Sequence, residues 1–473
     1  MVSGMQKKNS GFIGESKFKS IFNRILPEIR PTEEEIEELN AYSNDLMGRL
    51  KRIVPKDVEI ILAGSVARGT QIRGNSDIDI FLLFPKTTEE RLMEKKALLL
   101  ARKVVKKGNG ETFVINYAEH PYQKLISKKL DISADIVPAF KINDAADMGT
   151  AVDRTQLHNV FVKNHLNEKQ KDEVRLLKYF LRANSIYGAE SRIEGFSGYL
   201  CELLICHYGS FLELIKSFSE LELPLVLDIL KSKQINNREE ISKDVNFFKS
   251  EFIVIDPTDK ERNVAASVSR ESISRLVIAS RRLLDKPSVN NFYGIKYSDE
   301  NSRSSLSKML QQYEIDIYAI GIEVPEISED TLWPQIKRLK GKFSDSLKRN
   351  GFEPLLELQN LTNGRAAIAF LMNKKEIHAN VIKGPSVFMK NGSYAFYKKH
   401  ENGQNMFLDG DILCSIEKSK YESAGALLKS AFKDPGFSFP PDIRKRNCKI
   451  FINRIPEEYA KLVYPALLQK IGI

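Results

Sequence analysis

Two aspartates at the start of an apolar strand constrain this chain more than any other feature. The stretch GSVARGTQIRGNSDIDIFLLFP covers residues 64–85, and Asp77 and Asp79 stand in it at alternate positions. Because side chains alternate across a strand, both carboxylates point to one face, while Ile78 and Ile80 point to the other. Burying uncompensated carboxylates is costly, so the start of this strand requires a positive partner.

A divalent cation is a partner that fits this pattern. Two carboxylates about 7 Å apart along a strand can converge on one hard cation or on a pair of them. Mg²⁺ prefers oxygen ligands, commonly one or two carboxylates together with substrate phosphates. The run KLDISADIVPAF (129–140) offers a third carboxylate from a second strand, Asp135, with Asp131 at the same parity. The alternative is a solvated turn that carries two surface aspartates.

The residues before the aspartates favour the metal-site interpretation. Gly64 and Ser65 form a small-residue turn that leaves backbone N–H groups and a hydroxyl free to bind a triphosphate beside the metals. Arg68 and Arg73 can neutralise phosphate charge nearby. Two metals in such a site activate an attacking hydroxyl and neutralise a pyrophosphate leaving group, which predicts nucleotidyl transfer.

The length and charge of the chain indicate several domains and a polyanionic partner. A chain of 473 residues is too long for one core and predicts roughly two to four domains. The net charge of +10 and the pI near 9.1 are typical of proteins that bind nucleic acid. The four cysteines form no CxxC pair, which argues against a structural zinc site and a disulfide framework and indicates a reducing cytoplasm.

The chain shows no sign of a membrane segment. No apolar run approaches the roughly 20 residues that span a bilayer. The start, MVSGMQKKNSG, lacks the hydrophobic segment of a secretion signal, and either Met1 or Met5 could be the native start. We therefore expect a cytoplasmic protein without a membrane partner.

The pattern along the chain predicts three regions. An α/β pattern over 1–150 is followed by a mostly helical region over 151–290 and an α+β region over 291–473. In the first region we expect two helices, 31–54 with Thr32 as N-cap and 88–107, and four strands, 57–63, 76–84, 112–118 and 130–138. In the second, KDEVRLLKYFLRAN is expected to be helical, and 231–246 a loop or a short exposed helix.

The motifs together resemble a known family. GSVARGTQIRGNSDID looks like the signature of the polymerase-β-type nucleotidyltransferases. The stretches that narrow the resemblance to the archaeal, class I CCA-adding enzymes are YAEHPY (117–122), DRTQLHNVFV (153–162), EVRLLKYFLRANSIYGAE (173–190), GFSGYLCELLICHYGSF (195–211) and DPTDKERNVAA (256–266). The resemblance is dense from about 60 to 300 and weaker through the C-terminal third. It implies an α+β multidomain protein with a polymerase-β-like α/β head, a helical neck, and an α+β C-terminal body and tail.

The resemblance also implies roles for individual residues. Asp77, Asp79 and Asp135 match the catalytic, metal-binding positions, and magnesium, with two ions during catalysis, is the implied cofactor. The positions that match nucleotide-binding residues of the family are Gly64, Ser65, Arg68, Thr155, His158, Lys178, Tyr187 and Arg262. Arg262 matches an arginine implicated in base recognition.

Three of these residues, Lys178, Tyr187 and His158, also have a purely structural interpretation. On a helical wheel Arg175, Lys178 and Arg182 share one face, which is commonly just a solvated basic face. Tyr187 could be a core tyrosine with a satisfied hydroxyl, and His158 a structural histidine that need not titrate.

Basic and aromatic residues in the C-terminal third suggest an RNA surface. RNA helices are gripped mainly through phosphates and 2′-hydroxyls, and exposed bases stack on aromatic rings. The candidates, from KRLKGKF, FMKNGSYAFYKKH and IRKRNCK, are Lys337, Arg338, Tyr394, Tyr397, Arg444, Lys445 and Arg446. The alternatives are solvated charge and aromatics in the core of a strand. In the family this region reaches the tRNA elbow.

The expected function is template-independent addition and repair of the 3′-terminal CCA of tRNA from CTP and ATP, with pyrophosphate release. The expected partners are the tRNA acceptor stem and elbow, and the family implies a homodimer. One alternative is another nucleotidyltransferase of the same fold, such as a poly(A) polymerase or an A-adding enzyme. A non-catalytic RNA-binding scaffold is a third, against which the intact Asp77, Asp79 and Asp135 argue.

Overall fold

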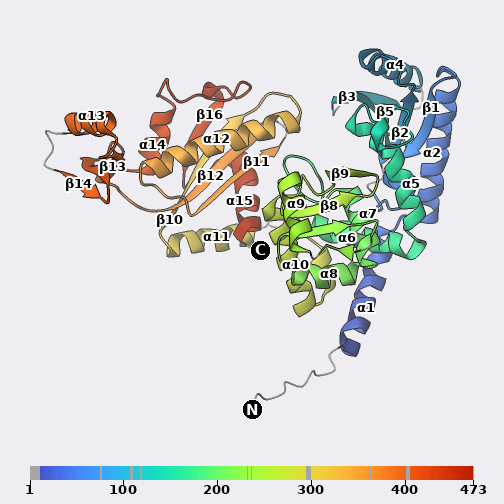
Figure 1. Ribbon diagram of the computed structural model, residues 1–473, viewed down its shortest axis with the longest axis horizontal. Coiled ribbons are helices and arrows are strands. Elements are labelled where there is room, and N and C mark those ends of the chain that lie inside the picture. The colour runs from blue at the N-terminus through green and yellow to red at the C-terminus, as the bar shows by residue number, and fades with distance from the viewer. Residues whose placement is uncertain are drawn as a thin grey trace. The chain divides into compact units, whose positions relative to one another are not determined.

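The computed structural model separates into two compact units, residues 1–294 and 295–473, and each is described by itself (Figure 1). The structure describes residues 11–74, 77–106, 110–117, 120–231, 233–235, 237–294, 300–362, 364–400 and 405–471. The candidate starts Met1 and Met5, residues 75, 76, 118 and 119 of the quoted motifs and the first residue of the strand expected at 76–84 lie outside the described residues.

Two helices open the first unit. Helix α1 spans Gly11–Ile29 and α2 spans Glu33–Lys51. Thr32 accepts from the backbone of Glu35, whose side chain accepts in return from the backbone of Thr32, so the predicted N-cap is confirmed as a full capping box.

A five-stranded sheet forms the centre of this region, in the order β1-β2-β5-β4-β3. The strands are β1 (Glu59–Ala63), β2 (Asp77–Phe84), β3 (Glu111–Tyr117), β4 (Pro121–Ser127) and β5 (Ile132–Phe140), with the short helix α3 (Gly64–Arg68) and helix α4 (Glu90–Lys103) between them. Strands β2 and β5 are parallel neighbours, and their register places Asp79 opposite Asp135.

The alternation predicted for β2 is present in the core. Ile78, Ile80 and Leu82 are fully buried on one face, in a cluster with residues of α2 and α4. Strand β4 was not predicted from the sequence, because Gln123 and Lys124 interrupt its apolar pattern.

Helices make up most of the rest of the first unit, but they are joined by a second sheet that the sequence pattern did not predict. The helices are α5 (Thr155–His165), α6 (Glu168–Ala183), α7 (Gly198–Tyr208), α8 (Phe211–Ser219), α9 (Arg238–Phe248) and α10 (Arg270–Asp285). The sheet has the order β7-β6-β8-β9, formed by β6 (Leu225–Asp228), β7 (Lys233–Gln234), β8 (Phe252–Asp256) and β9 (Asp259–Asn263). These strands are short, which is why the surrounding helical periodicity hid them.

Helix α9 has no buried residue among those described and corresponds to the short exposed helix that was one option for 231–246.

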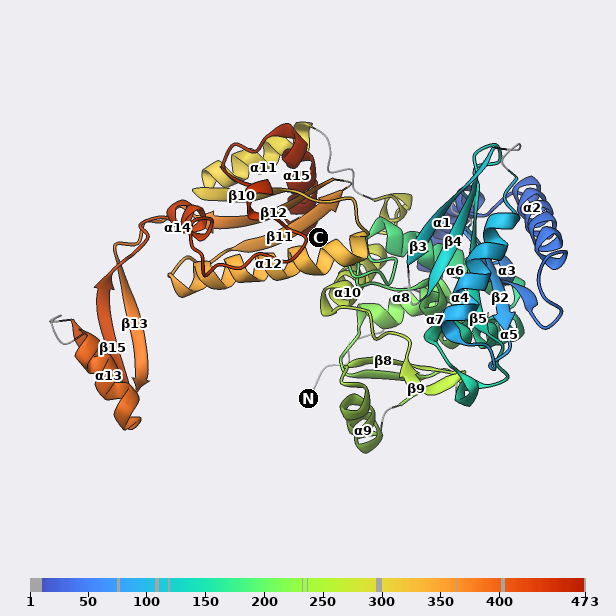
Figure 2. The ribbon, with the colours of Figure 1, turned by 90° about the horizontal axis from the view of Figure 1, so that it is seen from above.

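The second unit contains a four-stranded antiparallel sheet in the order β11-β12-β10-β16. Its elements are α11 (Glu300–Gln312), β10 (Ile315–Glu323), α12 (Glu329–Arg349), β11 (Leu356–Thr362), β12 (Arg365–Asn373), α14 (Ala424–Ala431), β16 (Cys448–Ile452) and α15 (Glu457–Ile471). Figure 2 shows α12 running along this sheet.

A smaller module in the second unit is built from β13 (Ala379–Ser386), β14 (Met406–Asp409) and β15 (Ile412–Lys418), with helix α13 (Lys390–His400) packed on them. The strand-core alternative for Tyr394 and Tyr397 is therefore wrong, because both lie on an exposed helix. Within the described residues, no helix combines the length and apolarity needed to cross a membrane.

Candidate active site

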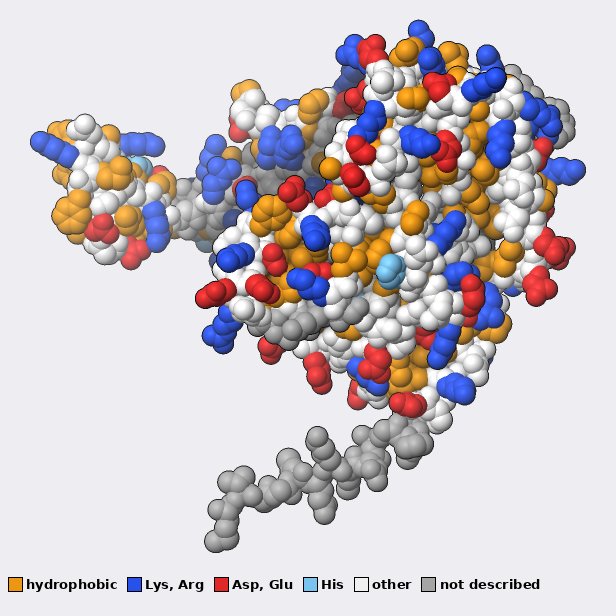
Figure 3. All heavy atoms as spheres, turned by 45° about the vertical axis from the view of Figure 1, so that its right-hand side comes forward, with side chains coloured by type: hydrophobic (Ala, Val, Ile, Leu, Met, Phe, Trp, Pro, Cys, Tyr) orange, Lys and Arg blue, Asp and Glu red, His pale blue; other side chains and the backbone are white. Residues whose placement is uncertain are grey.

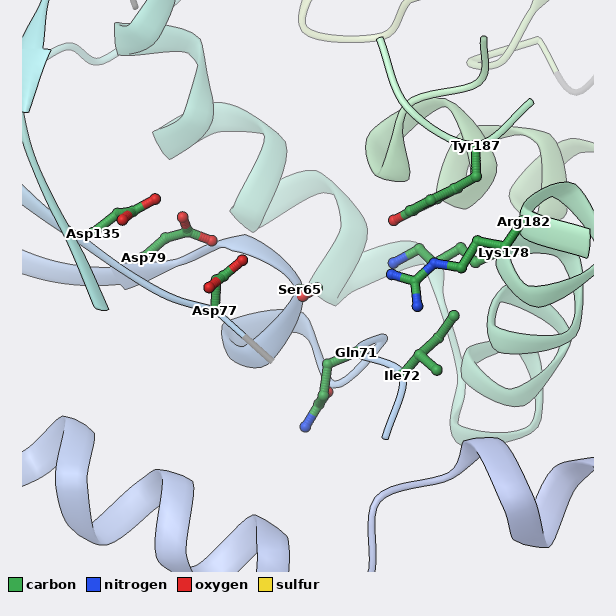
Figure 4. A pocket seen from close by; sticks show the side chains of 9 residues that line it. All are labelled: Ser65, Gln71, Ile72, Asp77, Asp79, Asp135, Lys178, Arg182 and Tyr187. Atoms are coloured by element: carbon green, nitrogen blue, oxygen red, sulfur yellow. The ribbon is translucent and has the colours of Figure 1, made fainter. Parts of the chain in front are cut away.

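A polar pocket lies where the end of β1 and the start of β2 meet helix α6. Figure 4 shows three aspartates on one side of it, Ser65 in the middle, and two cations with a tyrosine on the other side. The lining residues are Ser65, Gln71, Ile72, Asp77, Asp79, Asp135, Lys178, Arg182 and Tyr187. Residues more than a hundred positions apart in the sequence therefore share one cavity.

The acidic side is made by neighbouring parallel strands. Asp79 on β2 stands opposite Asp135 on β5. Lys124 on β4 donates to Asp77 Oδ1 at 2.9 Å and lies 3.9 Å from Asp135 Oδ1. The Ser133 hydroxyl also donates to Asp77.

The three carboxylates are not equally compensated. Burial raises the pKa of Asp79 to about 6, with the charge of Asp77 adding to the effect and that of Arg68 opposing it. Burial likewise raises the pKa of Asp135 to about 7, which Lys124 offsets only in part. Burial also works on Asp77, but hydrogen bonds from Ser133 and Lys124 bring its pKa below the ordinary value.

This donor set fits a divalent cation. Asp135 Oδ1 is buried and has no hydrogen-bond partner among the described residues. A buried oxygen without a donor is costly, and it is the atom that a hard cation would satisfy. Lys124 is the cation in contact with Asp77 and Asp135, and one lysine beside three carboxylates leaves room for further positive charge.

Gly64 is required by the position of Asp79. The backbone of Gly64 has φ +70°, and a Cβ there would stand 1.7 Å from Asp79 Oδ2. A side chain at this position would displace the carboxylate, so the small-residue turn and the acidic strand form one structural unit.

The basic side of the pocket is formed by α6 and the segment after it. Lys178 is 2% exposed, and its Nζ donates to the Thr70 carbonyl at 3.0 Å and to Thr70 Oγ1 at 3.2 Å. Burial lowers the pKa of Lys178, and the carboxylate of Glu202 opposes that shift. The guanidinium of Arg182 lies over the Tyr187 ring, 4.9 Å from its centroid.

The face shared by Arg175 and Lys178 is not solvated, so the interpretation of a solvated basic face is wrong for these two residues. Arg175 is buried and donates to the Gln71 carbonyl at 2.9 Å. Arg182, on the same face, lines the pocket.

Arg68 is not among the lining residues of this pocket. Its guanidinium is buried against α5 and α7, where Nε contacts Glu202 and Nη1 donates to Asn159 at 2.8 Å. Glu202 is fully buried and also lies 3.8 Å from Lys178 Nζ.

Two other predicted nucleotide-binding residues meet around Asp256 on β8. His158 Nε2 lies 3.0 Å from Asp256 Oδ2, and Arg262 donates to the same oxygen at 2.7 Å. The imidazole stacks on Tyr199, and burial lowers its pKa although Asp256 opposes the shift. Thr155 begins α5, one turn before His158. None of these residues lines the pocket described above.

Several site residues escaped the sequence interpretation. Lys124 could not be found because its strand was not predicted, and Gln71 and Ile72 lie in an irregular connection. Glu202 had a readable signal, a single carboxylate inside the apolar run YLCELLICHYG. Asp256, at the end of the apolar run FIVID, carried the same kind of signal.

A second group of potential metal ligands lies on α4 and at the residue just before β4. Ligand atoms of Glu90, Glu94 and His120 lie within 4.8 Å of one another. His120 Nδ1 is 2.9 Å from Glu94 Oε1, which is an ordinary hydrogen-bond distance. None of the three lines the pocket.

The predicted RNA contacts lie on the surface of the second unit. Lys337 and Arg338 are exposed on α12, and Tyr394 and Tyr397 on α13 are 61% and 46% exposed. Arg444, Lys445 and Arg446 are exposed before β16. Figure 3 shows lysines and arginines spread over the surface, with hydrophobic side chains exposed beside them.

Three family models match successive parts of the chain. The model "Nucleotidyltransferase domain" matches residues 44–158 and "tRNA nucleotidyltransferase, second domain" matches 172–293. The model "CCA-adding enzyme, C-terminal domain" matches 315–449.

Curated relatives match over most of the chain. A CCA-adding enzyme of Archaeoglobus fulgidus is 34% identical over 76% of this chain and 77% of its own length. A CCA-adding enzyme of Methanocaldococcus jannaschii is 32% identical over 91% of this chain and 95% of its own length. A solved structure of a cytoplasmic RNA terminal U-transferase covers 59% of this chain and 99% of its own, at 18% identity and a TM-score of 0.47, a likeness too weak to add to these matches.

Proposed function

The chain belongs to the CCA-adding enzymes of the archaeal type, and from that membership we propose how its pocket carries out the reaction. It is a nucleotidyltransferase with a multidomain, polymerase-β-like α+β fold, and it adds CCA to tRNA. The observation that carries the proposal for the site is the pocket itself, which places three aspartates across from Lys178 and Tyr187.

Asp77, Asp79 and Asp135 are the catalytic residues of this proposal. They would hold magnesium, with two ions during catalysis, and the fit rests on the raised pKa of Asp135 and on its Oδ1, which accepts no hydrogen bond among the described residues. When bound, the metal would supply activation of the attacking RNA hydroxyl and neutralisation of the leaving pyrophosphate. Asp135 lies beside Asp79 and is placed to orient the attacking 3′ end of the RNA.

The incoming CTP or ATP would lie between the two sides of the pocket. Ser65 offers a hydroxyl in the middle, and Lys178 and Tyr187 offer an ammonium and a phenol to the triphosphate. Gly64 leaves the space that the Asp79 carboxylate occupies. Arg68 does not line the pocket and would act on the nucleotide indirectly, through its contact with Glu202. Thr155, His158 and Arg262 are the other nucleotide-binding residues of this proposal, with Arg262 contacting the base; His158 and Arg262 lie together at Asp256.

The second unit would bind the acceptor stem and elbow of tRNA. Exposed Lys337, Arg338, Arg444, Lys445 and Arg446 can pair with phosphates, and the exposed rings of Tyr394 and Tyr397 can stack on unpaired bases. We propose a catalytic head over 1–150, a neck over 151–290 and a tRNA-binding body and tail over 291–473. A homodimer is proposed from the family resemblance, and a cytoplasmic location from the cysteine pattern, which is typical of a reducing compartment.

Substrate-truncation assays test this proposal. Purified protein is given tRNA that ends at the discriminator base, with CTP, ATP or both, and the products are sequenced. Ordered addition of C, C and A, followed by termination, is the expected result. Continued A-tails would indicate a poly(A) polymerase, and use of ATP alone an A-adding enzyme. Binding of tRNA without any nucleotide addition would indicate a scaffold.

A further inference from the structure

A fully buried carboxylate stands behind the basic side of the pocket. Glu202 lies in the middle of α7 between Cys201 and Leu203, and all three residues are 0% exposed. A charged side chain is almost never fully buried unless it is paired. The residues around Glu202 therefore determine whether it is structural or serves the pocket.

The partners of Glu202 come from two parts of the chain, α3 with the segment after it, and α6. Oε1 accepts from Arg68 Nε at 3.1 Å and from the Thr70 hydroxyl, and it lies 3.8 Å from Lys178 Nζ. Thr70 also accepts from Lys178 through its carbonyl and hydroxyl oxygens. Lys178 lines the pocket, whereas Arg68 and Glu202 are not among its lining residues. Lys178 is thus the member of this cluster that meets a ligand.

Of the two cations in this cluster, Lys178 is the one that can lose its proton. One carboxylate faces two cations in a dry environment, and a guanidinium does not lose its proton in proteins. If the carboxylate were neutralised, the repulsion between two buried cations would be relieved by deprotonation of Lys178.

We propose that Glu202 is a positioning residue for nucleotidyl transfer, because its carboxylate keeps the Lys178 ammonium charged and holds it at the pocket wall. The role of Lys178 toward the triphosphate is part of the proposed function, and this inference rests on it. Glu202 itself is not among the residues that line the pocket, so it would act on the nucleotide through Lys178.

Other groups around Lys178 do not supply this charge. Arg68 from α3 and Arg175 from α6 both oppose the protonated form. Burial raises the pKa of Cys201 to about 12 and raises that of Tyr187 as well, so neither becomes an anion near neutral pH. Among the described residues, Glu202 is the anion in contact with Lys178.

The pH dependence of the KM for nucleotide tests the proposal. Glu202→Gln keeps the size of the side chain and an acceptor for Thr70 but removes the charge. Measured with tRNA substrate between about pH 6 and pH 10, the KM for CTP and ATP in this variant is expected to rise at least about tenfold at a pH where the parent is still flat. The rise should begin about one pH unit or more below that of the parent, with a smaller effect on kcat. Glu202→Asp, which retains the charge, should restore much of the parent profile.

Two further variants separate the possible failures. Glu111→Gln removes another buried carboxylate, which pairs with Arg49 away from the pocket, and should leave the pH profile unchanged. Lys178→Met should raise the KM at every pH, and adding Glu202→Gln to it should change nothing more.

The outcomes are distinguishable. If Lys178→Met leaves the KM unchanged, the proposed nucleotide contact of Lys178 fails. If Lys178→Met raises the KM but Glu202→Gln keeps the parent profile, the role proposed for Glu202 is overturned and the site assignment stands. Should circular dichroism show Glu202→Gln unfolded, the profile of Glu202→Asp decides: a shift smaller than about one unit in the same direction supports the proposal, and an unchanged profile overturns it.

Discussion

Two charged clusters flank the same pocket, and they are built in opposite ways. On the acidic side three carboxylates stand beside one lysine, Lys124, which contacts Asp77 and Asp135, and Asp135 Oδ1 accepts no hydrogen bond from any residue that the structure describes. On the basic side every charge of the Arg68–Glu202–Lys178 cluster contacts an opposite charge. The first cluster therefore sets three carboxylates against one contacting cation, whereas the second sets one carboxylate against two cations.

The difference indicates where a ligand is expected to bind. Leaving carboxylates under-compensated costs stability, and their geometry is useful only if a cation is to occupy the gap. A buried cation that must meet a phosphate has the opposite requirement, because without a nearby anion it would lose its proton. The comparison therefore predicts that neutralising a charge has different consequences on the two sides.

The largest effect is expected for chemistry on the acidic side. Asp79→Asn removes a proposed metal ligand and should lower the turnover of nucleotide addition by more than about 100-fold. Even the loss of a residue that only hydrogen-bonds a metal ligand typically lowers metal affinity or activity by about 10–100-fold. Affinity for tRNA, measured by filter binding, should stay within a few-fold. Asp131→Asn, a nearby exposed aspartate with φ 52° that asparagine tolerates, is the matched control and should turn over normally. Near-normal turnover in Asp79→Asn would remove the metal site from the proposal.

For the free energy of unfolding, the larger loss is expected on the basic side of the pocket. Glu202→Gln leaves Arg68 and Lys178 buried without an anion and should lower the free energy of unfolding by about 3–5 kcal/mol. Asp135→Asn, in chelator at a pH above 7 where the native carboxylate is charged, should leave that free energy unchanged or raise it. Urea unfolding of both variants beside the parent measures the difference. Equal losses would mean that the two clusters are compensated alike.

The elements that could be predicted from the sequence are those with a strong local pattern. The capping box at Thr32 and the alternation in β2 follow from neighbouring residues, and both are present. Strand β4 and the small β6–β9 sheet depend on partners distant in the sequence, and the pattern missed them. The aspartates could be predicted because burying two carboxylates at the start of an apolar strand costs free energy in any fold, so the pattern itself indicates a site. Lys124 was not found, because it faces Asp135 only through strand pairing.

A smaller structural effect is expected at the point that joins the turn to the acidic strand. Gly64→Ala places a methyl group where Asp79 Oδ2 lies and holds a non-glycine residue at φ +70°. The free energy of unfolding should fall by about 1–3 kcal/mol, and activity should fall with the displacement of Asp79. Gly74→Ala, at φ +69° but with open space around it, carries the backbone strain alone. If both variants lose the same activity, the contact with Asp79 does not matter.

The pH dependence of stability tests the acidic cluster directly. Because the folded-state pKa values of Asp79 and Asp135 lie above the ordinary 3.8, the folded protein binds more protons than the unfolded chain from about pH 4 to about pH 7. Their contribution to stability is therefore present at low pH and lost as the pH rises through this range, and the loss is on the order of 5 kcal/mol. Thermal unfolding in chelator should show it, relative to the Asp79→Asn, Asp135→Asn double variant. Magnesium should remove or reverse the difference, since it stabilises the charged carboxylates. If the stability of the parent and that of the double variant change in parallel with pH in chelator, the predicted contribution of Asp79 and Asp135 is contradicted.

The smallest effect on the folded protein is expected where charge is fully solvated. Arg444, Lys445 and Arg446 in the second unit are exposed, so replacing all three with glutamine should change the free energy of unfolding by less than about 0.5 kcal/mol. Binding is where these charges should act, since each phosphate contact releases counterions. The triple variant should bind tRNA a few-fold more weakly and with a shallower dependence on salt. Replacing three other exposed lysines of the second unit, Lys374, Lys375 and Lys433, with glutamine removes the same charge and is the control. If both variants change the salt dependence alike, the cluster acts through general charge; if neither does, it contributes nothing to tRNA binding.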